Sequence, residues 1–235
     1  MRWIFIVLVL ITYNALKAQT ITSTELLDKA IAFHDPNDQW SQLNNTFKVL
    51  MKTPKSSDRL SIIDINIPRE QFKLQVEKDN NSYSYSFNKQ DCITHLNGST
   101  DITEEDRNEY RLTCERGTVM RNYYTYLYGL PMKIKDPGTI LHEKVLTKTF
   151  KGKDYLVLKV NYEEGVGKDV WYFYFDPNTY AMEVYQFYHD EAKNDGEYIL
   201  LEGLEEIQGI KMPKTRAWYY NKDNKYLGTD ILIKN

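Results

Sequence analysis

The sequence predicts a mainly β protein with some α-helix (α+β), built on one curved antiparallel sheet or half-barrel of about 10 or 11 strands. The first observation is the stretch 169–233, which is dense in aromatic and β-branched residues. The second is the turn chemistry that divides this stretch at regular intervals. The third is a strand register that keeps apolar side chains on one face, which is typical of a sheet covered on one side.

The turn at 176–179, Asp-Pro-Asn-Thr, predicts how its two flanking strands pair. We expect three pairs across it: Phe175 with Tyr180, Phe173 with Met182, and Trp171 with Val184. Side chains alternate between the two faces of a strand, so these six would share one apolar face. The loop at 163–168 predicts that the same face continues onto the preceding strand, through the pairs Leu156–Phe175, Leu158–Phe173 and Val160–Trp171.

Two later turns extend the same sheet. Gln208-Gly209 is typical of a two-residue hairpin turn, because glycine readily adopts positive φ. The pairs expected across it are Ile207–Ile210, Ile199–Trp218 and Leu201–Arg216. The turn at 221–224 predicts three more pairs: Leu227–Trp218, Thr229–Arg216 and Ile231–Lys214. A slip of one residue would reverse the faces, so the agreement between these turns favours one continuous sheet.

Helices are predicted at two places before this stretch. Thr22 and Glu25 have the spacing of a capping box, and Asp35-Pro36 ends the helix that follows. Strands are then expected at roughly 44–52, 59–67, 70–78 and 82–88. A helical insertion begins at Thr103 and continues as a second helix over about 116–128. The apolar stripe of that second helix consists of Val119, Met120, Tyr123, Tyr124 and Leu127, and we expect it to cover the concave face of the sheet.

The N-terminus predicts export. Residues 1–18 combine a basic start, a short apolar run and a small residue before the expected cleavage site, as a signal peptide does. A membrane anchor is the alternative, but the run is short for a membrane span. The residue directly after the expected cleavage site is Gln19 rather than a cysteine, so we do not expect the usual lipid anchor of a lipoprotein. We therefore expect one soluble domain at 19–235, periplasmic or secreted, with no transmembrane segment after cleavage.

The charge balance argues against nucleic acid as a partner, and the sequence has no basic stripe. The chain has 30 Lys and Arg and 33 Asp and Glu, and loss of Arg2 and Lys17 with the leader gives a net charge of −5. The two cysteines, Cys92 and Cys114, form either a disulfide or two buried free thiols; an oxidising compartment permits the disulfide.

No catalytic or metal-binding motif is recognisable. The four histidines, at positions 34, 95, 142 and 189, lack the spacing of metal ligands, and no Gly-x-Ser-x-Gly or phosphate-binding loop occurs. We therefore expect no cofactor, no metal and no enzymatic activity. A hydrolase whose site forms only in three dimensions, around His142 or His189, is the alternative.

The chain resembles known proteins in two ways. The stretches YLYGLPMKIKDPGT and VWYFYFDPNTYAMEVYQFYHDEAKNDGEYI resemble a family of exported Bacteroidota proteins of unknown function. The order of elements, an N-terminal helix followed by strands with helices inserted between them, resembles the periplasmic lipoprotein carriers with the LolA/LolB-like fold. This second resemblance implies an unclosed half-barrel with a helical lid and a cavity that takes up acyl chains.

These observations favour an exported, monomeric carrier for a lipid or another apolar ligand. The expected cavity residues are Trp171, Phe173, Met182 and Trp218, and the expected lid residues are Met120, Tyr124 and Leu127. Arg216, on the apolar face with Lys214, needs an acidic partner such as Glu197 or Glu205, or the acidic head group of a ligand. The alternative is a slip or bulge that turns Arg216 outward, or an edge position from which its charged end reaches solvent.

Two other interpretations of the same residues stay open. In one, the helices simply fill the concave face as a core. In the other, the protein is a non-catalytic module that binds proteins or glycans through exposed tyrosines on the opposite face of the sheet: Tyr172, Tyr174, Tyr185 and Tyr219.

Overall fold

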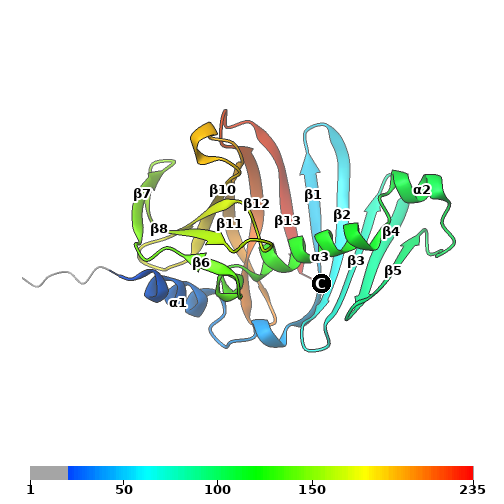
Figure 1. Cartoon of the computed structure of the whole chain (residues 1–235), viewed down its shortest axis with the longest axis horizontal. Coiled ribbons are helices and arrows are strands. Elements are labelled where there is room, and N and C mark those ends of the chain that lie inside the picture. Colours follow the sequence, from blue (N-terminus) through cyan, green and yellow to red (C-terminus); the bar gives the residue numbers. More distant parts are fainter. Residues whose placement is uncertain (1–20, 235) are drawn as a thin grey trace, which may run out of the picture.

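The computed structural model describes residues 21–234, and the predicted signal peptide lies outside this range. Within it, thirteen strands form one sheet that does not close into a barrel (Figure 1). All of the strand pairs are antiparallel. The predicted class, a curved antiparallel sheet with an N-terminal helix and a helical insertion, is confirmed, with more strands than expected.

The first five strands are β1 (Asn44–Thr53), β2 (Ser56–Asn66), β3 (Gln71–Lys78), β4 (Asn81–Asn88) and β5 (Asp91–Leu96). The other eight are β6 (Thr139–Leu141), β7 (Leu146–Phe150), β8 (Lys153–Tyr162), β9 (Val170–Phe175), β10 (Met182–Tyr188), β11 (Glu197–Ile207), β12 (Ile210–Tyr220) and β13 (Tyr226–Lys234). The helices are α1 (Ser23–His34), α2 (Glu104–Glu109) and α3 (Cys114–Gly129), with short 3₁₀ turns η1 (Trp40–Gln42), η2 (Met132–Lys135) and η3 (Glu191–Lys193). In the range 21–234, no helix combines the length and the apolarity needed to cross a membrane.

The strand order places the first and last strands at the centre of the sheet. It runs β5-β4-β3-β2-β1-β13-β12-β11-β10-β9-β8-β6, with β7 paired to β8 outside this path. The first and last strands, β1 and β13, therefore pair with each other and join two halves made of successive hairpins. Alternation gives each strand one core face; on β3, for example, Phe72, Leu74 and Val76 are buried.

Helix α3 crosses the concave side of this sheet (Figure 1). It begins near β4 and β5 and extends towards β8 and β9, so one helix spans both halves. Gly117 permits the close approach at its first end, because a Cβ there would lie 2.9 Å from Cδ1 of Tyr85. The bond between Cys92 of β5 and Cys114 of α3 fixes the same end, with a Cα–Cα distance of 5.9 Å. The disulfide alternative predicted from the sequence is the one that forms.

Two of the predicted hairpin registers are confirmed. The pairs Leu156–Phe175, Leu158–Phe173 and Val160–Trp171 join β8 to β9. The pairs Ile199–Trp218, Leu201–Arg216 and Ile207–Ile210 join β11 to β12.

The register predicted across the 176–179 turn is wrong. Phe175 pairs with Met182, not with Tyr180. Tyr180 has a φ of 63° and donates its backbone N–H to the carbonyl of Asp176, so the connection is longer than a four-residue turn.

A bulge between Met182 and Val184 shifts this register a second time. Tyr185, rather than Val184, therefore shares the core face with Phe173, and its side chain is completely buried. Val184 lies on the opposite face, in a smaller cluster with Tyr172 and Tyr174.

The register predicted across the 221–224 turn is wrong by one residue. Trp218 lies opposite Gly228 instead of Leu227, and Arg216 lies opposite Asp230 instead of Thr229. The structure has a bulge in this hairpin between Trp218 and Tyr219, a feature that turn residues alone do not reveal. The shift places an acidic side chain beside Arg216.

Helix α1 begins and ends as its sequence predicts. Thr22 caps it in a capping box with Glu25, and Asp35 follows its last residue. His34 in the last turn is fully buried. Its Nδ1 lies 2.6 Å from the carbonyl oxygen of Lys211, and the backbone N–H of Met182 donates to its Nε2 over 2.9 Å. This pattern requires the neutral ring with the proton on Nδ1, and burial lowers the pKa of His34 from 6.5 to about 4.

We predict that His34 makes the free energy of unfolding fall on acidification at pH values higher than those at which most carboxylates titrate. A histidine with a lowered pKa in the folded state favours folding above its unfolded pKa of 6.5, and this contribution is lost as the pH falls towards 4. The loss approaches about 3 kcal/mol, at about 1.4 kcal/mol per pKa unit. Urea unfolding measured at several pH values between 7 and 4.5 should show this fall in the free energy of unfolding.

His34→Gln should be less stable at pH 7 but should lose less stability on acidification. His189→Gln is the matched control, because His189 is exposed and its pKa is raised by Asp169. An unchanged pH slope in His34→Gln would contradict the prediction.

Candidate functional site

The eight predicted ligand-binding residues converge between α3 and the sheet. Phe173 and Met182 of the sheet and Tyr124 and Leu127 of α3 are buried in one apolar cluster. Trp171, Trp218 and Met120 are partly buried against the same cluster. Arg216 lies beneath α3 with 1% of its surface exposed. Val119 does not belong to the buried stripe, because it is 54% exposed on the outer side of the helix.

Aromatic side chains of α3 cover the concave face. Tyr126 packs edge-on against Trp171, with ring centroids 5.6 Å apart. Tyr123 stacks on Trp218 at 6.4 Å. In this arrangement the predicted cavity residues contact the helix directly. A ligand can reach them only if these ring contacts are exchanged for contacts with the ligand.

Arg216 ties the sheet to the helix. Its Nη1 donates to the carbonyl of Pro213 at 3.0 Å, and its Nη2 reaches the carbonyl of Leu127, in α3, at 3.4 Å. Its guanidinium carbon also lies 3.9 Å from the centre of the Tyr128 ring, which is a cation–π contact. Three contacts with neighbouring groups thus hold a fully buried charge.

Asp230 is the acidic neighbour of Arg216 that the sequence analysis missed. It is 4% exposed, lies directly opposite Arg216 on β13 and accepts a hydrogen bond from Nε1 of Trp218 at 3.2 Å. Burial raises the pKa of Asp230, and the guanidinium groups of Arg216 and Arg59 oppose that rise. The carboxylate of Glu205, a predicted partner, instead binds exposed Lys214 at 2.7 Å.

A second arginine reaches the same region from β2. Nη2 of Arg59 lies 3.5 Å from the hydroxyl of Tyr124, and that hydroxyl donates to Ser61 at 2.9 Å. The interface therefore holds two cations and one anion together with several phenols.

Some of these buried polar atoms have no hydrogen-bond partner in the described part of the chain. They are Nε of Arg59, Nε of Arg216, Oδ1 of Asp230 and the hydroxyls of Tyr128 and Tyr185. Unpaired buried polar atoms are costly, typically about 1–3 kcal/mol each. Their concentration beneath one helix marks this interface as a place suited to a ligand that offers polar atoms.

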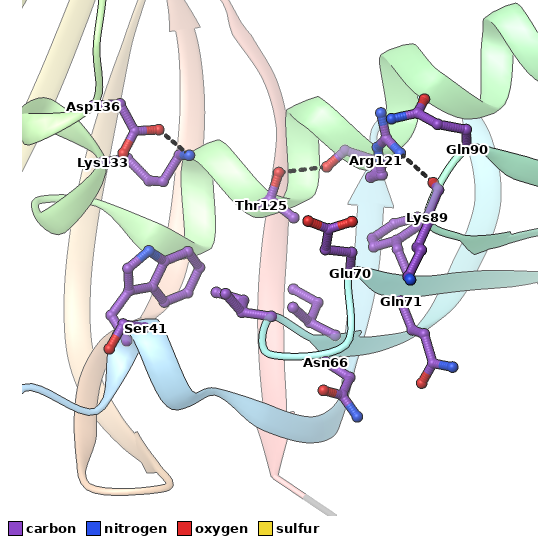
Figure 2. A pocket seen from close by; sticks show the side chains of 14 residues that line it. Ser41, Asn66, Glu70, Gln71, Lys89, Gln90, Arg121, Thr125, Lys133 and Asp136 are labelled. Carbon is purple, nitrogen blue, oxygen red and sulfur yellow. Dashed lines mark hydrogen bonds and ion pairs between the residues drawn. The ribbon is translucent and has the colours of Figure 1, made fainter.

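An open pocket of about 530 Å³ lies along one flank of α3 (Figure 2). Arg121 and Thr125 of α3 form one wall, and Glu70 in the β2–β3 turn lies across from them. Apolar side chains of Ile65 and Phe72 contribute to its lining. The pocket gives solvent access to the edge of the interface between helix and sheet.

The structure contradicts the tyrosine surface expected for an interaction module. Tyr172 and Tyr174 are 6% and 2% exposed, and Tyr185 lies fully buried on the core face, while Tyr219 is half-buried. Strand β7 explains the first two, because Phe150 packs against Tyr174 and Lys148 lies over Tyr172 on that face.

The two histidines considered for a hydrolase site each contact one polar side chain. Nε2 of His142 contacts Asn161 at 2.7 Å, and Nδ1 of His189 contacts Asp169 at 2.7 Å on the surface. In residues 21–234, no three or more His, Cys, Asp or Glu side chains lie close enough together to hold a metal ion.

Comparison with solved structures shows a shared fold at low sequence identity. A LolA superfamily protein from Nitrosomonas europaea is 12% identical with a TM-score of 0.51, over 92% of this chain and 93% of that one. A DUF1329 family protein from Desulfovibrio piger is 11% identical with a TM-score of 0.49, over 90% of both chains. A domain named for outer membrane lipoprotein sorting, from Vibrio parahaemolyticus, is 13% identical with a TM-score of 0.46, over 90% of this chain and 89% of that one.

The first of these similarities establishes a LolA-like fold. No curated protein matches the chain. The model of one protein family, described as a family of unknown function (DUF6503), matches residues 2–235. Because this match spans almost the whole sequence, the chain belongs to the DUF6503 family.

Proposed function

We propose that this protein is an exported carrier that binds a lipid or another apolar ligand between α3 and the concave face of the sheet. The observation that carries the proposal is the composition of this interface. Aromatic rings from both sides meet there, around buried polar atoms that the protein leaves unpaired. A ligand with a long apolar part would replace the ring contacts, and its polar atoms would bind the unpaired groups.

The attachment of α3 suggests which end moves. Its first turns are fixed by the Cys92–Cys114 disulfide and by the close contact at Gly117. Within the described residues, the later turns have no covalent link to the sheet. They rest on contacts of Tyr123 with Trp218 and of Tyr126 with Trp171, on the bond from Arg216 to Leu127, and on the close approach of Gly129 to Trp40. We infer that the C-terminal half of α3 lifts while the N-terminal half stays in place.

The energetics permit this exchange. Burial of one methylene group contributes about 0.8 kcal/mol, so a chain of about twelve carbons contributes roughly 9 kcal/mol. An aromatic pair contributes about 0.5–1.5 kcal/mol beyond its buried area. An acyl chain that occupies the same apolar face can therefore offset the loss of two ring pairs and one hydrogen bond.

Two further observations support export and a carrier role. The disulfide is typical of proteins that fold in an oxidising compartment. The fold is shared with a LolA superfamily protein, and the resemblance of this sequence to lipoprotein carriers implies uptake of acyl chains.

We predict that the protein, expressed with its leader and purified without detergent, co-purifies with a lipid. Native mass spectrometry should show the added mass, and solvent extraction should recover it. Trp171→Asp should reduce the bound fraction at least about tenfold, because a carboxylate in an apolar site must be desolvated.

Val166→Asp is the matched control, since Val166 is 57% exposed in a hairpin turn. Both variants must unfold in a cooperative thermal transition. If Trp171→Asp does not fold, Trp171→Gln replaces it as the test variant. A ligand-free mass that persists after incubation with membrane lipids would contradict the proposal.

We also predict that the buried charges of Arg216 and Asp230 are coupled in their contributions to the free energy of unfolding. Arg216→Met should lower the free energy of unfolding by about 3–5 kcal/mol, because it leaves Asp230 buried without its cationic neighbour. The double variant Arg216→Met/Asp230→Leu should be more stable than Arg216→Met alone. Urea unfolding of the wild type, both single variants and the double variant measures this coupling; strictly additive effects would contradict it.

A further inference from the structure

A small cavity lies at the flank of α3 away from the pocket in Figure 2. With 3.6 residues per turn, its α3 residues Arg116 and Met120 project about 140° from Arg121 and Thr125. The cavity has a volume of about 70 Å³ and is lined by β2, β3, β4, the end of α2 and the first half of α3. A water molecule needs about 10–15 Å³ by this measure, so the space suits a group of about five non-hydrogen atoms, such as a phosphate or a carboxylate with its α-carbon.

The lining of this cavity is cationic. Arg59 lies on its sheet side, and Arg111 and Arg116 lie on its helix side. No acidic side chain contributes to the lining, and within residues 21–234 none of the three arginines forms an ion pair. Nε of Arg59 is buried without a hydrogen-bond partner. Three guanidinium groups around a partly enclosed space favour an anion, because arginine forms strong paired hydrogen bonds with phosphate and carboxylate.

The cavity shares two lining residues with an outer basin and lies beside the apolar interface. These two, Arg111 and Arg116, line the outer basin together with Arg107 and one acidic residue, Glu115, so the basin carries an excess of positive charge. Such a surface attracts anions from solution. On the inner side, Met120 packs against the main apolar cluster, and Arg59 reaches the hydroxyl of Tyr124 beneath α3.

We propose that Arg59, Arg111 and Arg116 bind the anionic head group, phosphate or carboxylate, of an amphiphilic ligand whose apolar tail lies beneath α3. This inference rests on the carrier function proposed above and names its ligand class. The head group belongs here rather than at Arg216, because Arg216 lies opposite the acidic Asp230 and its Nη1 binds the carbonyl of Pro213, whereas no acidic side chain of the described residues lines this cavity. Binding at this end leaves the fixed half of α3 in place while the tail displaces the other half.

Isothermal titration calorimetry of the delipidated full-length mature protein tests the inference with three probes: dodecyl phosphate, the uncharged dodecyl maltoside and inorganic phosphate. We expect dodecyl phosphate to bind at least about tenfold more tightly than the other two, which is the contribution of one charge-assisted hydrogen bond. Arg111→Gln/Arg116→Gln should weaken dodecyl phosphate binding at least about tenfold and leave dodecyl maltoside unchanged. Both substitutions lie at the rim of the cavity, and the glutamine side chain preserves most of their length.

Arg69→Gln is the control, because Arg69 is an exposed arginine in the β2–β3 turn that lines neither this cavity, nor the outer basin, nor the pocket in Figure 2. This variant should bind all three probes as the wild type does. Equal binding of the charged and uncharged amphiphiles, unaffected by Arg111→Gln/Arg116→Gln, would overturn the head-group site and leave the carrier function standing. If inorganic phosphate binds as tightly as dodecyl phosphate, the site binds a free anion, and the proposal of an amphiphilic ligand is overturned. Failure of both amphiphiles to bind would overturn the carrier function as well.

Discussion

The packing of α3 on the concave face is the interaction on which the rest of this structure depends. An unclosed sheet has an apolar face that must be covered, and here a single helix spans both halves of the sheet. Tyr124 and Leu127 from the helix meet Phe173 and the neighbouring aromatic residues of the sheet. The stability of the contacts between α3 and the sheet therefore decides between two interpretations, a permanently filled core and a binding site.

The buried charges of Arg216 and Asp230 help to distinguish a permanent core from a binding site. Apolar residues of similar size would cover the face at equal or lower cost in free energy than a buried arginine and aspartate. Arg216 and Asp230 instead leave Nε and Oδ1 unpaired beneath the helix. An interface with unpaired polar atoms gains stability from any ligand that pairs them, which is the behaviour expected of a binding site rather than of a permanent core.

Much of the fold follows from local sequence rules, whereas the site depends on details that those rules do not contain. Alternation and turn chemistry predicted the sheet, the α1 capping box and two hairpin registers. The other two registers were predicted wrongly, one because the turn after Phe175 is longer than four residues and is followed by a bulge at Glu183, the other because of a bulge beside Trp218. The second error hid Asp230 as the neighbour of Arg216. Arg59 shares a strand face with buried Ser61 and Ile63, so the alternation of the sequence could have predicted that it points inward. Its proximity to Arg111 and Arg116 depends on the fold and could not be predicted from this pattern.

Hydrogen–deuterium exchange of the α3 backbone amides tests the central claim, that this helix is a movable cover, most directly. Local opening makes amides exchange with a lower free energy than global unfolding does. The account predicts that the amides of Tyr123 to Gly129 exchange well before those of β11 and β12 in the ligand-free protein. The amides of Gly117 to Met120, the first that are hydrogen-bonded within the backbone of α3, should exchange more slowly than those of Tyr123 to Gly129. Equal protection of all of α3 and the central strands would show a permanent layer of the core and contradict the account.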